Sequence, residues 1–501
     1  MNLYTKYSPL YLICFLIIGI VAGIGASAPK LVKFGTLLFF AITLIGIFLL
    51  LFKKSLGFFY TIFISGIVLF ENNFKLGGIG VIDLFVMSSV FILLLYFPTK
   101  NNTYLETSTN KKNFIISVLF TIYFAFSTVG IIEYEGSFLV GISKSLIFEI
   151  PYISLYFLIT IVLISRDNVL KVIKVLIAFA TIASIIAIIQ YVSNGTMLSG
   201  LITNFRYLGL FNEIPLYKNT ADIQHLRAFV PETNKFRAHG TFYAHNLFAA
   251  LIGSTIILSF IFLKEKIKKK WKVYYLLTIT IQFLALVFTS SRGGVLTSAF
   301  CIGLLYFLNY KKNVFSSTMI KLILVIIISS IGLIIITMIK PSILESRIFN
   351  LDINNIKELT DRLKLWKIAL VQSKEDMFLG SGTDFLDPSM TSFLIFDLVA
   401  PHNMFLHILY SKGIIPLLSV IIILLVTITK SLKVIFNSNR KEDRYIVSCL
   451  LCSLISLLGS GVTESLFVNT NLKILFMLLI ALSIFFVNGS NIKNQGGEFY
   501  E

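Results

Sequence analysis

The chain has 501 residues, of which 56% are hydrophobic and 14% are charged, and its formal net charge is +18. A mean hydropathy of +0.87, with apolar runs of about 20 residues, excludes an ordinary soluble domain. A β-barrel is also excluded, because its alternating segments of about ten residues are not found in the sequence. The composition therefore predicts an all-α, polytopic transmembrane helical bundle.

Taken in chain order, the apolar runs predict about 12 to 14 spans, each long enough to cross the hydrocarbon core of a bilayer. The third run is short, and the junction at 290–293 is tight. The candidate spans cover residues 8–28, 33–52, 56–71, 79–97, 113–131, 146–164, 169–192, 244–263, 273–290, 293–309, 319–339, 408–429, 444–462 and 471–487.

The loops between these spans alternate between basic and weakly charged. With the N-terminus inside, the short loops on one side are strongly basic and the opposite short loops carry only scattered charge, which is the bias expected of cytoplasmic loops. These residues include Lys53, Lys54, Lys100, Lys111, Lys112, Arg166, Lys264, Lys266, Lys268, Lys269, Lys270, Lys272, Lys311, Lys312, Lys430, Lys433, Arg440, Lys441 and Arg444. The pattern predicts cytoplasmic N- and C-termini, and it explains the net charge without a nucleic-acid partner.

The orientation divides the chain into five parts. Residues 1–192 form N-terminal transmembrane helices, and 193–243 form an outer loop. Residues 244–339 form transmembrane helices that include the Arg292 junction. Residues 340–402 form a long outer catalytic loop, and 403–501 form C-terminal transmembrane helices. Long outer segments of this kind are typically functional or disordered.

The second outer segment contains an amphipathic helix. Its apolar residues, Ile356, Leu359, Leu363, Trp366 and Leu370, recur at steps of three and four. The helix either lies flat at the membrane surface or packs against the bundle, and both interpretations fit the pattern.

Histidines concentrate at the same side of the membrane. All five, His225, His239, His245, His402 and His407, fall in or beside the two outer segments, which favours chemistry at the outer face. They lack zinc-ligand spacing and clustered carboxylates, so we predict no metal and no cofactor. The four cysteines, Cys14, Cys301, Cys449 and Cys452, lie in apolar runs and are predicted to be buried thiols.

Five ordered segments together resemble the O-antigen polymerase and O-antigen ligase family of bacterial membrane glycosyltransferases. They are Arg237–Asn246, Ser290–Gly294, Asp361–Ala369, Gly380–Phe385, and Pro401–Asn403 followed by His407 and Lys412-Gly413. The resemblance covers about residues 230–430. One departure is His245, where family members commonly have proline, which leaves open whether His245 contributes to the chemistry.

Two arginines are candidates for binding phosphate. Arg292, between Ser290-Ser291 and Gly293-Gly294, is either a topology or capping residue or a phosphate ligand. Arg362, close to Glu358 and Asp361, looks on its own like part of a helix-surface ion pair. The resemblance implies instead that both arginines bind the diphosphate of the substrate, for which a planar guanidinium is well suited.

His402 follows Pro401 and opens the next predicted span. A lone histidine at a helix start is commonly a cap or a core residue, whereas an ionisable group at the mouth of a membrane bundle is a candidate for function. The resemblance implies that His402 is catalytic, as a general base or as a group that positions the acceptor.

Further substrate-binding candidates are Arg237, Asn246, Asn403, Trp366, Gly382 and Glu464. Asn403 either orients His402 or binds a sugar hydroxyl. Gly380 and Gly382 form either an anion-binding nest or an ordinary turn. Asp83, Glu149 and Glu464 lie near the outer ends of predicted spans, where each either binds sugar hydroxyls or is simply solvated at the interface.

The resemblance implies a metal-independent, inverting glycosyltransferase at the outer face of the bacterial cytoplasmic membrane. Its substrate would be a polyprenyl-diphosphate-linked oligosaccharide within the lipid bilayer, and chain-length regulators and flippases would be its protein partners. A polymerase of repeat units (O-antigen, lipopolysaccharide or capsule type) is favoured, with a ligase as the alternative. A lipid-linked oligosaccharide flippase also fits the number of spans, but internal repeats expected of a transporter are not evident.

Overall fold

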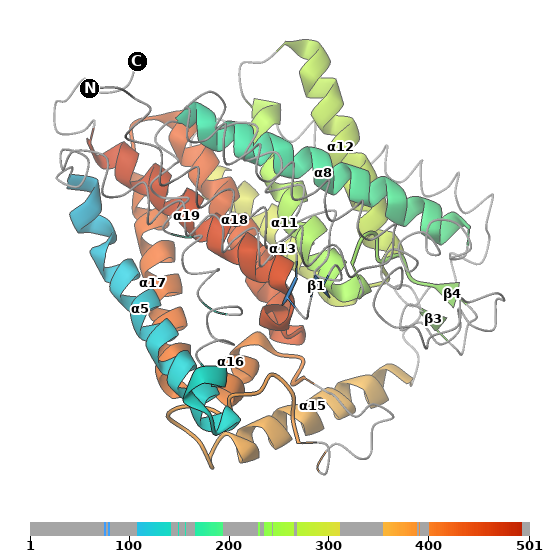
Figure 1. The fold of residues 1–501 in the computed structure, drawn as a ribbon. Coiled ribbons are helices and arrows are strands. Elements are labelled where there is room, and N and C mark those ends of the chain that lie inside the picture. Colours follow the sequence, from blue (N-terminus) through green and yellow to red (C-terminus); the bar gives the residue numbers. More distant parts are fainter. Residues whose placement is uncertain are drawn as a thin grey trace, which may run out of the picture.

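The computed structural model describes residues 75–76, 79–80, 108–141, 149, 156, 166–193, 229–230, 235–242, 244–264, 268–310, 354–387, 390 and 400–492. In this part of the chain, 7 helices are long and apolar enough to cross a membrane. They are α5 (Ser108–Glu135), α8 (Arg166–Val192), α11 (His245–Lys264), α12 (Lys269–Phe288), α13 (Arg292–Tyr310), α17 (Ile414–Asn437) and α18 (Lys441–Thr463). This confirms the predicted polytopic helical bundle (Figure 1).

Shorter or less apolar elements complete the described fold. They are α15 (Asn354–Gln372), α16 (Met404–Lys412), the 3₁₀ turn η4 (Leu466–Val468) and α19 (Thr470–Ile492). Two small antiparallel pairs join β1 (Lys75–Leu76) to β2 (Ile79–Gly80) and β3 (Phe229–Val230) to β4 (Lys235–Phe236).

Helix α11 lies at the centre of the bundle, in contact with α8, α12, α13 and α18. Its side chains are mostly apolar and are buried from Leu247 to Leu263, as expected for a helix surrounded by others. Small residues allow this close approach: a Cβ atom placed on Gly253 would lie 2.3 Å from the Ser298 hydroxyl oxygen. Small side chains are the usual means by which membrane helices pack closely.

A buried hydrogen-bond network links α8, α11 and α12. The Gln282 amide nitrogen donates to the Thr181 hydroxyl oxygen at 3.1 Å, and the Thr255 hydroxyl donates to the Gln282 amide oxygen at 3.1 Å. Polar side chains in a membrane bundle contribute to helix association when they find such partners. The network therefore fixes α8 and α12 relative to α11, the helix that carries Asn246 of the site described below.

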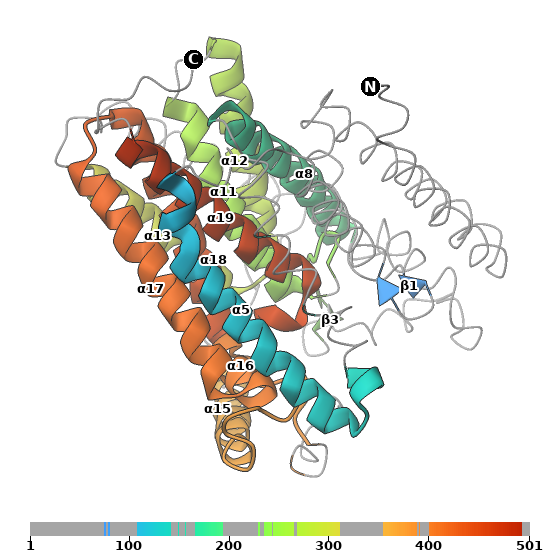
Figure 2. The same ribbon diagram turned by 60° about the vertical axis from the view of Figure 1, so that its left-hand side comes forward.

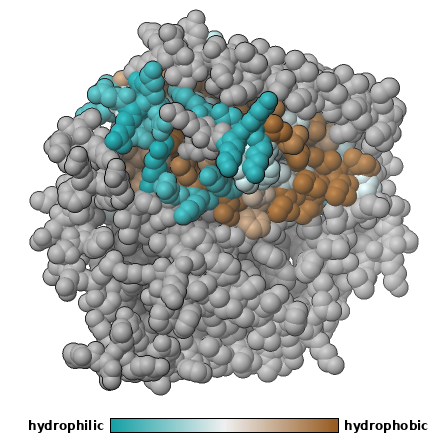
Figure 3. Space-filling view, turned by 90° about the horizontal axis from the view of Figure 1, so that it is seen from above, coloured by the Kyte–Doolittle hydropathy of each residue, from teal (hydrophilic) through white to brown (hydrophobic). Residues whose placement is uncertain are grey.

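Basic residues gather at one end of the bundle, which we call the basic end. It comprises the start of α8, the end of α11, the start of α12 and the α17–α18 junction. Arg166 pairs with Glu442 at 3.0 Å, and the Lys264 ammonium lies 4.1 Å from the centre of the Tyr445 ring. Seen from this end, hydrophilic side chains cluster beside hydrophobic ones on the described surface (Figure 3).

Helix α5 runs beside α17 in both ribbon views, and α16 lies near their lower ends (Figures 1 and 2). Helix α15 runs crosswise beneath α16 and is seen nearly along its axis in Figure 2. Its Leu365 and Ala369 pack with Leu386 and Tyr410, a face that the predicted apolar stripe did not include. Leu363, which belongs to the predicted stripe, is 51% exposed. That this face of α15 contacts the membrane surface therefore remains a prediction.

The predicted span 408–429 was wrong at its start. Helix α16 ends at Lys412, and the membrane-length helix α17 begins at Ile414. Gly413 separates them, since its φ of 91° lies in a region that favours glycine and interrupts the helix. His402 therefore precedes a short helix of 9 residues rather than a span.

The tight junction near residue 290 is confirmed, because α12 ends at Phe288 and α13 begins at Arg292. The predicted spans 113–131, 169–192, 244–263, 293–309, 444–462 and 471–487 coincide closely with helices. The predicted spans 8–28, 33–52, 56–71, 79–97, 146–164 and 319–339 lie outside the described residues, apart from isolated positions.

Candidate active site

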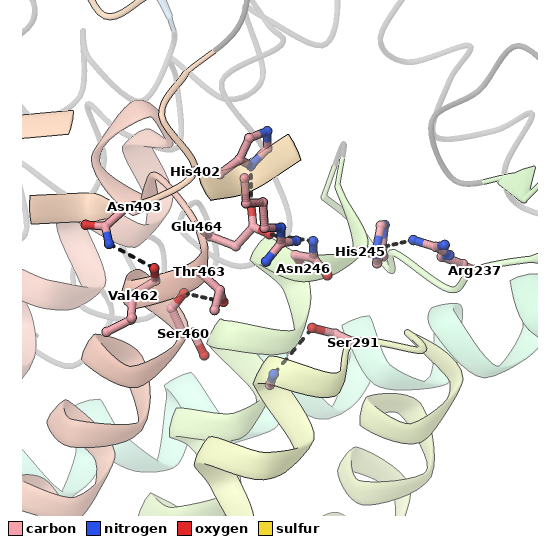
Figure 4. A network of polar contacts seen from close by, with 12 residues as sticks. Arg237, His245, Asn246, Ser291, His402, Asn403, Ser460, Val462, Thr463 and Glu464 are labelled. Atoms are coloured by element: carbon pink, nitrogen blue, oxygen red, sulfur yellow. Dashed lines mark hydrogen bonds and ion pairs between the residues drawn. The ribbon is translucent and has the colours of Figure 1, made fainter. Parts of the chain in front are cut away.

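Glu464 is the centre of a polar cluster at the end of α18 opposite the basic end (Figure 4). The Asn246 amide nitrogen donates to Glu464 Oε1 at 2.6 Å, and Arg362 Nη2 donates to the same oxygen at 3.2 Å. His402 Nδ1 lies 3.1 Å from the other oxygen, Oε2. The carboxylate thus joins the start of α11, helix α15 and the segment before α16. We call Asn246, Arg362, His402 and Glu464 the Glu464 cluster.

The charge of Glu464 follows from its surroundings. The residue is only 7% exposed, and burial by itself would raise the pKa of its carboxyl. The nearby His402 and Arg362, with the hydrogen bond from Asn246, more than offset burial and hold that pKa below its ordinary value. Glu464 is therefore ionised at neutral pH.

His402 adopts an unusual backbone conformation for a residue with a side chain. Its φ of 52° lies in the left-handed region, and the segment is held by its neighbour Asn403. The Asn403 side chain accepts hydrogen bonds from the backbone N–H groups of Phe405 and Leu406, at 2.9 and 3.1 Å, and so caps α16. Its amide nitrogen also donates to the Val462 carbonyl at 3.0 Å. These contacts favour an orienting role for Asn403.

The contact with Glu464 also selects one form of the His402 ring. A carboxylate only accepts hydrogen bonds, so in a neutral imidazole the proton lies on Nδ1 and Nε2 carries the lone pair. The side chain of His402 is 41% exposed, so the ring is reachable while one of its nitrogens is held. Such a ring can take a proton from a substrate hydroxyl.

Arg292 is the first residue of α13 and lies at the same end of the bundle as the Glu464 cluster. Its two following glycines allow close packing: a Cβ on Gly293 would lie 3.0 Å from the Thr463 hydroxyl oxygen, and one on Gly294 would lie 2.7 Å from the Ala249 Cβ. Thr463 directly precedes Glu464. The partly buried Arg292 is therefore attached to a helix that packs beside the Glu464 segment.

Arg237 and His245 form a pair next to the Glu464 cluster (Figure 4). Arg237 Nη1 lies 2.9 Å from His245 Nε2, and since a guanidinium only donates, this histidine nitrogen accepts. His245 is the first residue of α11 and precedes Asn246. The residue that departs from the family pattern therefore contacts the arginine of the same motif.

The two glycines of the fourth motif are engaged within the protein. Gly380 and Gly382 have φ values of 72° and 68°, and their N–H groups donate to the carbonyls of Asp376 and Ser411. Donors used in this way favour the turn over the anion-binding nest. Trp366 is partly buried on α15, one turn after Arg362.

Interfacial solvation was the wrong interpretation for two of the acidic residues. Glu464 and Glu149 are only 7% and 2% exposed, and both have cationic partners. Their partners are distant in sequence, so no local sequence signal predicted these ion pairs. The third acidic residue, Asp83, lies outside the described residues. Within the described ranges, no group of three or more His, Cys, Asp or Glu side chains could hold a metal ion.

The comparison with protein families supports the interpretation of the motifs. Residues 275–421 match the family model described as O-antigen ligase. This match confirms the resemblance predicted from the motifs and supports transfer of glycans at a membrane. The match includes Arg292, Arg362 and His402, whereas Arg237, Asn246 and Glu464 lie outside it. The search of curated proteins found no match.

Proposed function

We propose that the protein is a membrane glycosyltransferase that polymerises polyprenyl-diphosphate-linked oligosaccharide repeat units into a surface polysaccharide. The observation that carries this proposal is the Glu464 carboxylate, which contacts both Arg362 and His402. Glu464 thereby holds both a cation for a phosphate leaving group, Arg362, and a base for an acceptor hydroxyl, His402. The family domain over residues 275–421 supplies the class of reaction.

The arginines act on the leaving group. As the bond between the anomeric carbon and the diphosphate oxygen breaks, negative charge develops on the diphosphate. Arg362 and Arg292 stabilise this charge with guanidinium donors that suit phosphate oxygens. Because these side chains supply the positive charge, the reaction requires no metal ion.

His402 acts on the acceptor. Its Nε2 takes the proton from a sugar hydroxyl while that oxygen forms the new bond to the anomeric carbon. The ionised Glu464 holds Nδ1 and stabilises the imidazolium that results, as a carboxylate does in other histidine-based sites. Attack opposite the leaving diphosphate inverts the anomeric configuration. The product is a longer glycan on the acceptor lipid and a free polyprenyl diphosphate.

The placement of the site agrees with this substrate. The Glu464 cluster lies at the end of the bundle opposite the basic end, so it faces outward if the basic end is cytoplasmic. The polyprenyl chain would lie among the spans of the cytoplasmic membrane, with the glycan projecting from it. A transporter would instead place its polar groups near the middle of the membrane.

The decisive experiment is an analysis of lipid-linked glycans in a deletion strain that expresses single variants. Loss of a polymerase leaves single repeat units on lipid, whereas loss of a ligase leaves long lipid-linked chains. Restoring wild-type protein should restore chain extension. Expressing His402→Ala instead should give about 100-fold less extension than wild type, or lower still, because the general base is removed.

A matched control is Lys374→Ala, which removes an exposed residue of the same outer segment and should extend chains normally. Long lipid-linked chains in the deletion strain would replace the polymerase assignment with a ligase. Normal extension by His402→Ala, at equal protein level, would remove the catalytic role of His402.

A further inference from the structure

The fourth sequence motif lies against the last part of the fifth, His407 and Lys412-Gly413, and the proposed chemistry uses neither of these two segments. The fourth motif, Gly380–Phe385, runs along the C-terminal half of α16: the backbone N–H of Ser381 donates to the Tyr410 carbonyl at 2.7 Å. Asp384 Oδ1 lies 3.3 Å from His407 Nε2. The fourth motif is therefore attached to the helix that follows His402.

The fifth motif ends in a buried cation, Lys412, which is 6% exposed. Its ammonium lies 3.0 Å from Glu149 Oε1 and 3.9 Å from Asp384 Oδ1. Glu149 is itself 2% exposed and lies 4.0 Å from the ammonium of Lys473 on α19. Charges buried to this extent are tolerated only when they are paired, so these side chains belong to one unit. We call Glu149, Asp384, His407 and Lys412 the α16 clamp.

The charges in this clamp are maintained. Burial alone would lower the pKa of Lys412, but Glu149 and Asp384 raise it above its ordinary value. Burial alone would raise the pKa of Asp384, but Lys412 and His407 bring it well below its usual range. The ammonium and the carboxylate are therefore both ionised at neutral pH, and their attraction holds the end of α16 in place.

The clamp and the catalytic candidate lie at opposite ends of one short helix. At the first end, His402 has a φ of 52°, a conformation that a residue with a side chain adopts only when the surrounding structure enforces it. At the other end, Lys412 is held by Glu149. A helix of 9 residues moves as a rigid unit, so a shift at Lys412 is transmitted to the segment that carries His402.

We propose that Glu149 is a positioning residue, which fixes α16 through Lys412 so that His402 faces Glu464. The proposal rests on the proposed function for its kinetic readout only. It also assigns a role to the N-terminal part of the chain, because Glu149 precedes the family domain that contains Lys412. The clamp thus connects Glu149, in the N-terminal part of the chain, to α16.

The test is the double variant Glu149→Gln/Lys412→Met in membranes that contain the full chain. Removing both charges leaves neither Glu149 nor Lys412 buried and unpaired, and Asp384, whose side chain is 37% exposed, keeps its contact with His407, so the variant should fold. Its kcat for glycan extension should fall about 10- to 100-fold, since small displacements of a catalytic group have effects of this size. Its KM should change less than about 3-fold, because the lipid-linked substrate is bound elsewhere.

A second readout does not depend on transferase activity. Diethyl pyrocarbonate modification of His402, followed by mass spectrometry, should become about twofold faster or more once its contact with Glu464 loosens. Modification of the buried His239 should stay slow and serves as a control for intact folding. Glu442→Gln, which alters an exposed ion pair at the basic end, should behave as wild type in both assays.

Unchanged kcat and unchanged His402 modification in the double variant would overturn the proposal. Equally faster modification of His402 and His239 would also overturn the proposal, because it would indicate that the whole fold is loosened and not only the position of His402. If wild-type membranes extend no glycan, the proposed function fails, and the modification rates alone then decide the positioning role.

Discussion

At the scale of single residues, Glu464 connects two residues to which the proposed mechanism gives different tasks. It holds His402 through Oε2 and Arg362 through Oε1. In the proposed mechanism, the same carboxylate orients the base, His402, and restrains the cation, Arg362, which also contacts the leaving group. Substitution of Glu464 and of Arg362 separates these two roles.

Glu464→Gln should lower kcat for glycan extension by about 10-fold or more, because the ring of His402 loses the charge that fixes its tautomer and stabilises the imidazolium. The measurement is the initial rate with a lipid-linked oligosaccharide substrate at equal protein amounts. Glu375→Gln, which changes an exposed carboxylate of the same outer segment, is the matched control and should be fully active. A fully active Glu464→Gln would show that His402 needs no carboxylate.

Arg362→Lys should fold normally yet lose about 10-fold in kcat/KM, since an ammonium can pair with Glu464 but cannot bind phosphate oxygens bidentately. The same transfer assay measures it. Lys367→Arg, an exchange of the same two residue types on the exposed side of α15, should change nothing. Wild-type activity in Arg362→Lys would mean that this position supplies only charge.

At the scale of elements, the break between α16 and α17 shapes the site. Gly413 allows the chain to turn between the two helices and to meet the segment that precedes the fourth motif: the backbone N–H of Ile414 donates to the Met377 carbonyl at 2.8 Å. A continuous helix from residue 404 onward would not allow this hydrogen bond, because the Ile414 N–H group would then bond within the helix. The break therefore places α16 between the bundle and α15 (Figure 1).

Gly413→Ala should destabilise the protein by about 1 to 3 kcal/mol, because φ is 91° and the new Cβ would lie 2.2 Å from the Phe378 carbonyl oxygen. Denaturant unfolding in detergent measures the loss. The control is Gly303→Ala in α13, where the added Cβ meets nothing within 4 Å. That change should be neutral, or stabilising by up to about 1 kcal/mol. Equal stability of the two variants would contradict this account of the break.

At the scale of the whole molecule, the basic end and the candidate active site lie at opposite ends of the bundle. The basic end contains the α17–α18 junction and the start of α12, whereas the Glu464 cluster lies at the opposite end. A cytoplasmic basic end would put the site where lipid-linked glycans project from the membrane.

Cysteine labelling tests this orientation. With the native cysteines replaced, Glu375→Cys should react with a membrane-impermeant maleimide in cells whose cytoplasmic membrane is intact. Lys269→Cys, at the start of α12, should react only after permeabilisation, because it would lie in the cytoplasm. The reverse pattern would place the site inside the cell and exclude the proposed substrate orientation.

Much of the described bundle could be predicted because hydrophobicity is a local property. Runs such as 169–192 and 444–462 have a composition that only a membrane or a protein core accommodates, whatever their partners. The start of α17 was predicted wrongly because the predicted span began at Ile408 and ran across Ser411, Lys412 and Gly413, whereas the positive φ of Gly413 separates two helices at this point. Likewise, Leu365 and Ala369 became the packing face of α15 because Tyr410 and Leu386 lie opposite them.

The sequence by itself determined that the chain is a helical membrane protein, which helix ends are basic, and which ordered motifs it shares with a glycan-transferring family. Only the tertiary structure decided that Glu464 contacts Arg362 and His402, which lie 102 and 62 residues away from it. It also decided that Glu149 neutralises Lys412. The physical reason is that a buried charge needs a partner, and which partner it finds depends on how α11, α15, α16 and α18 pack together.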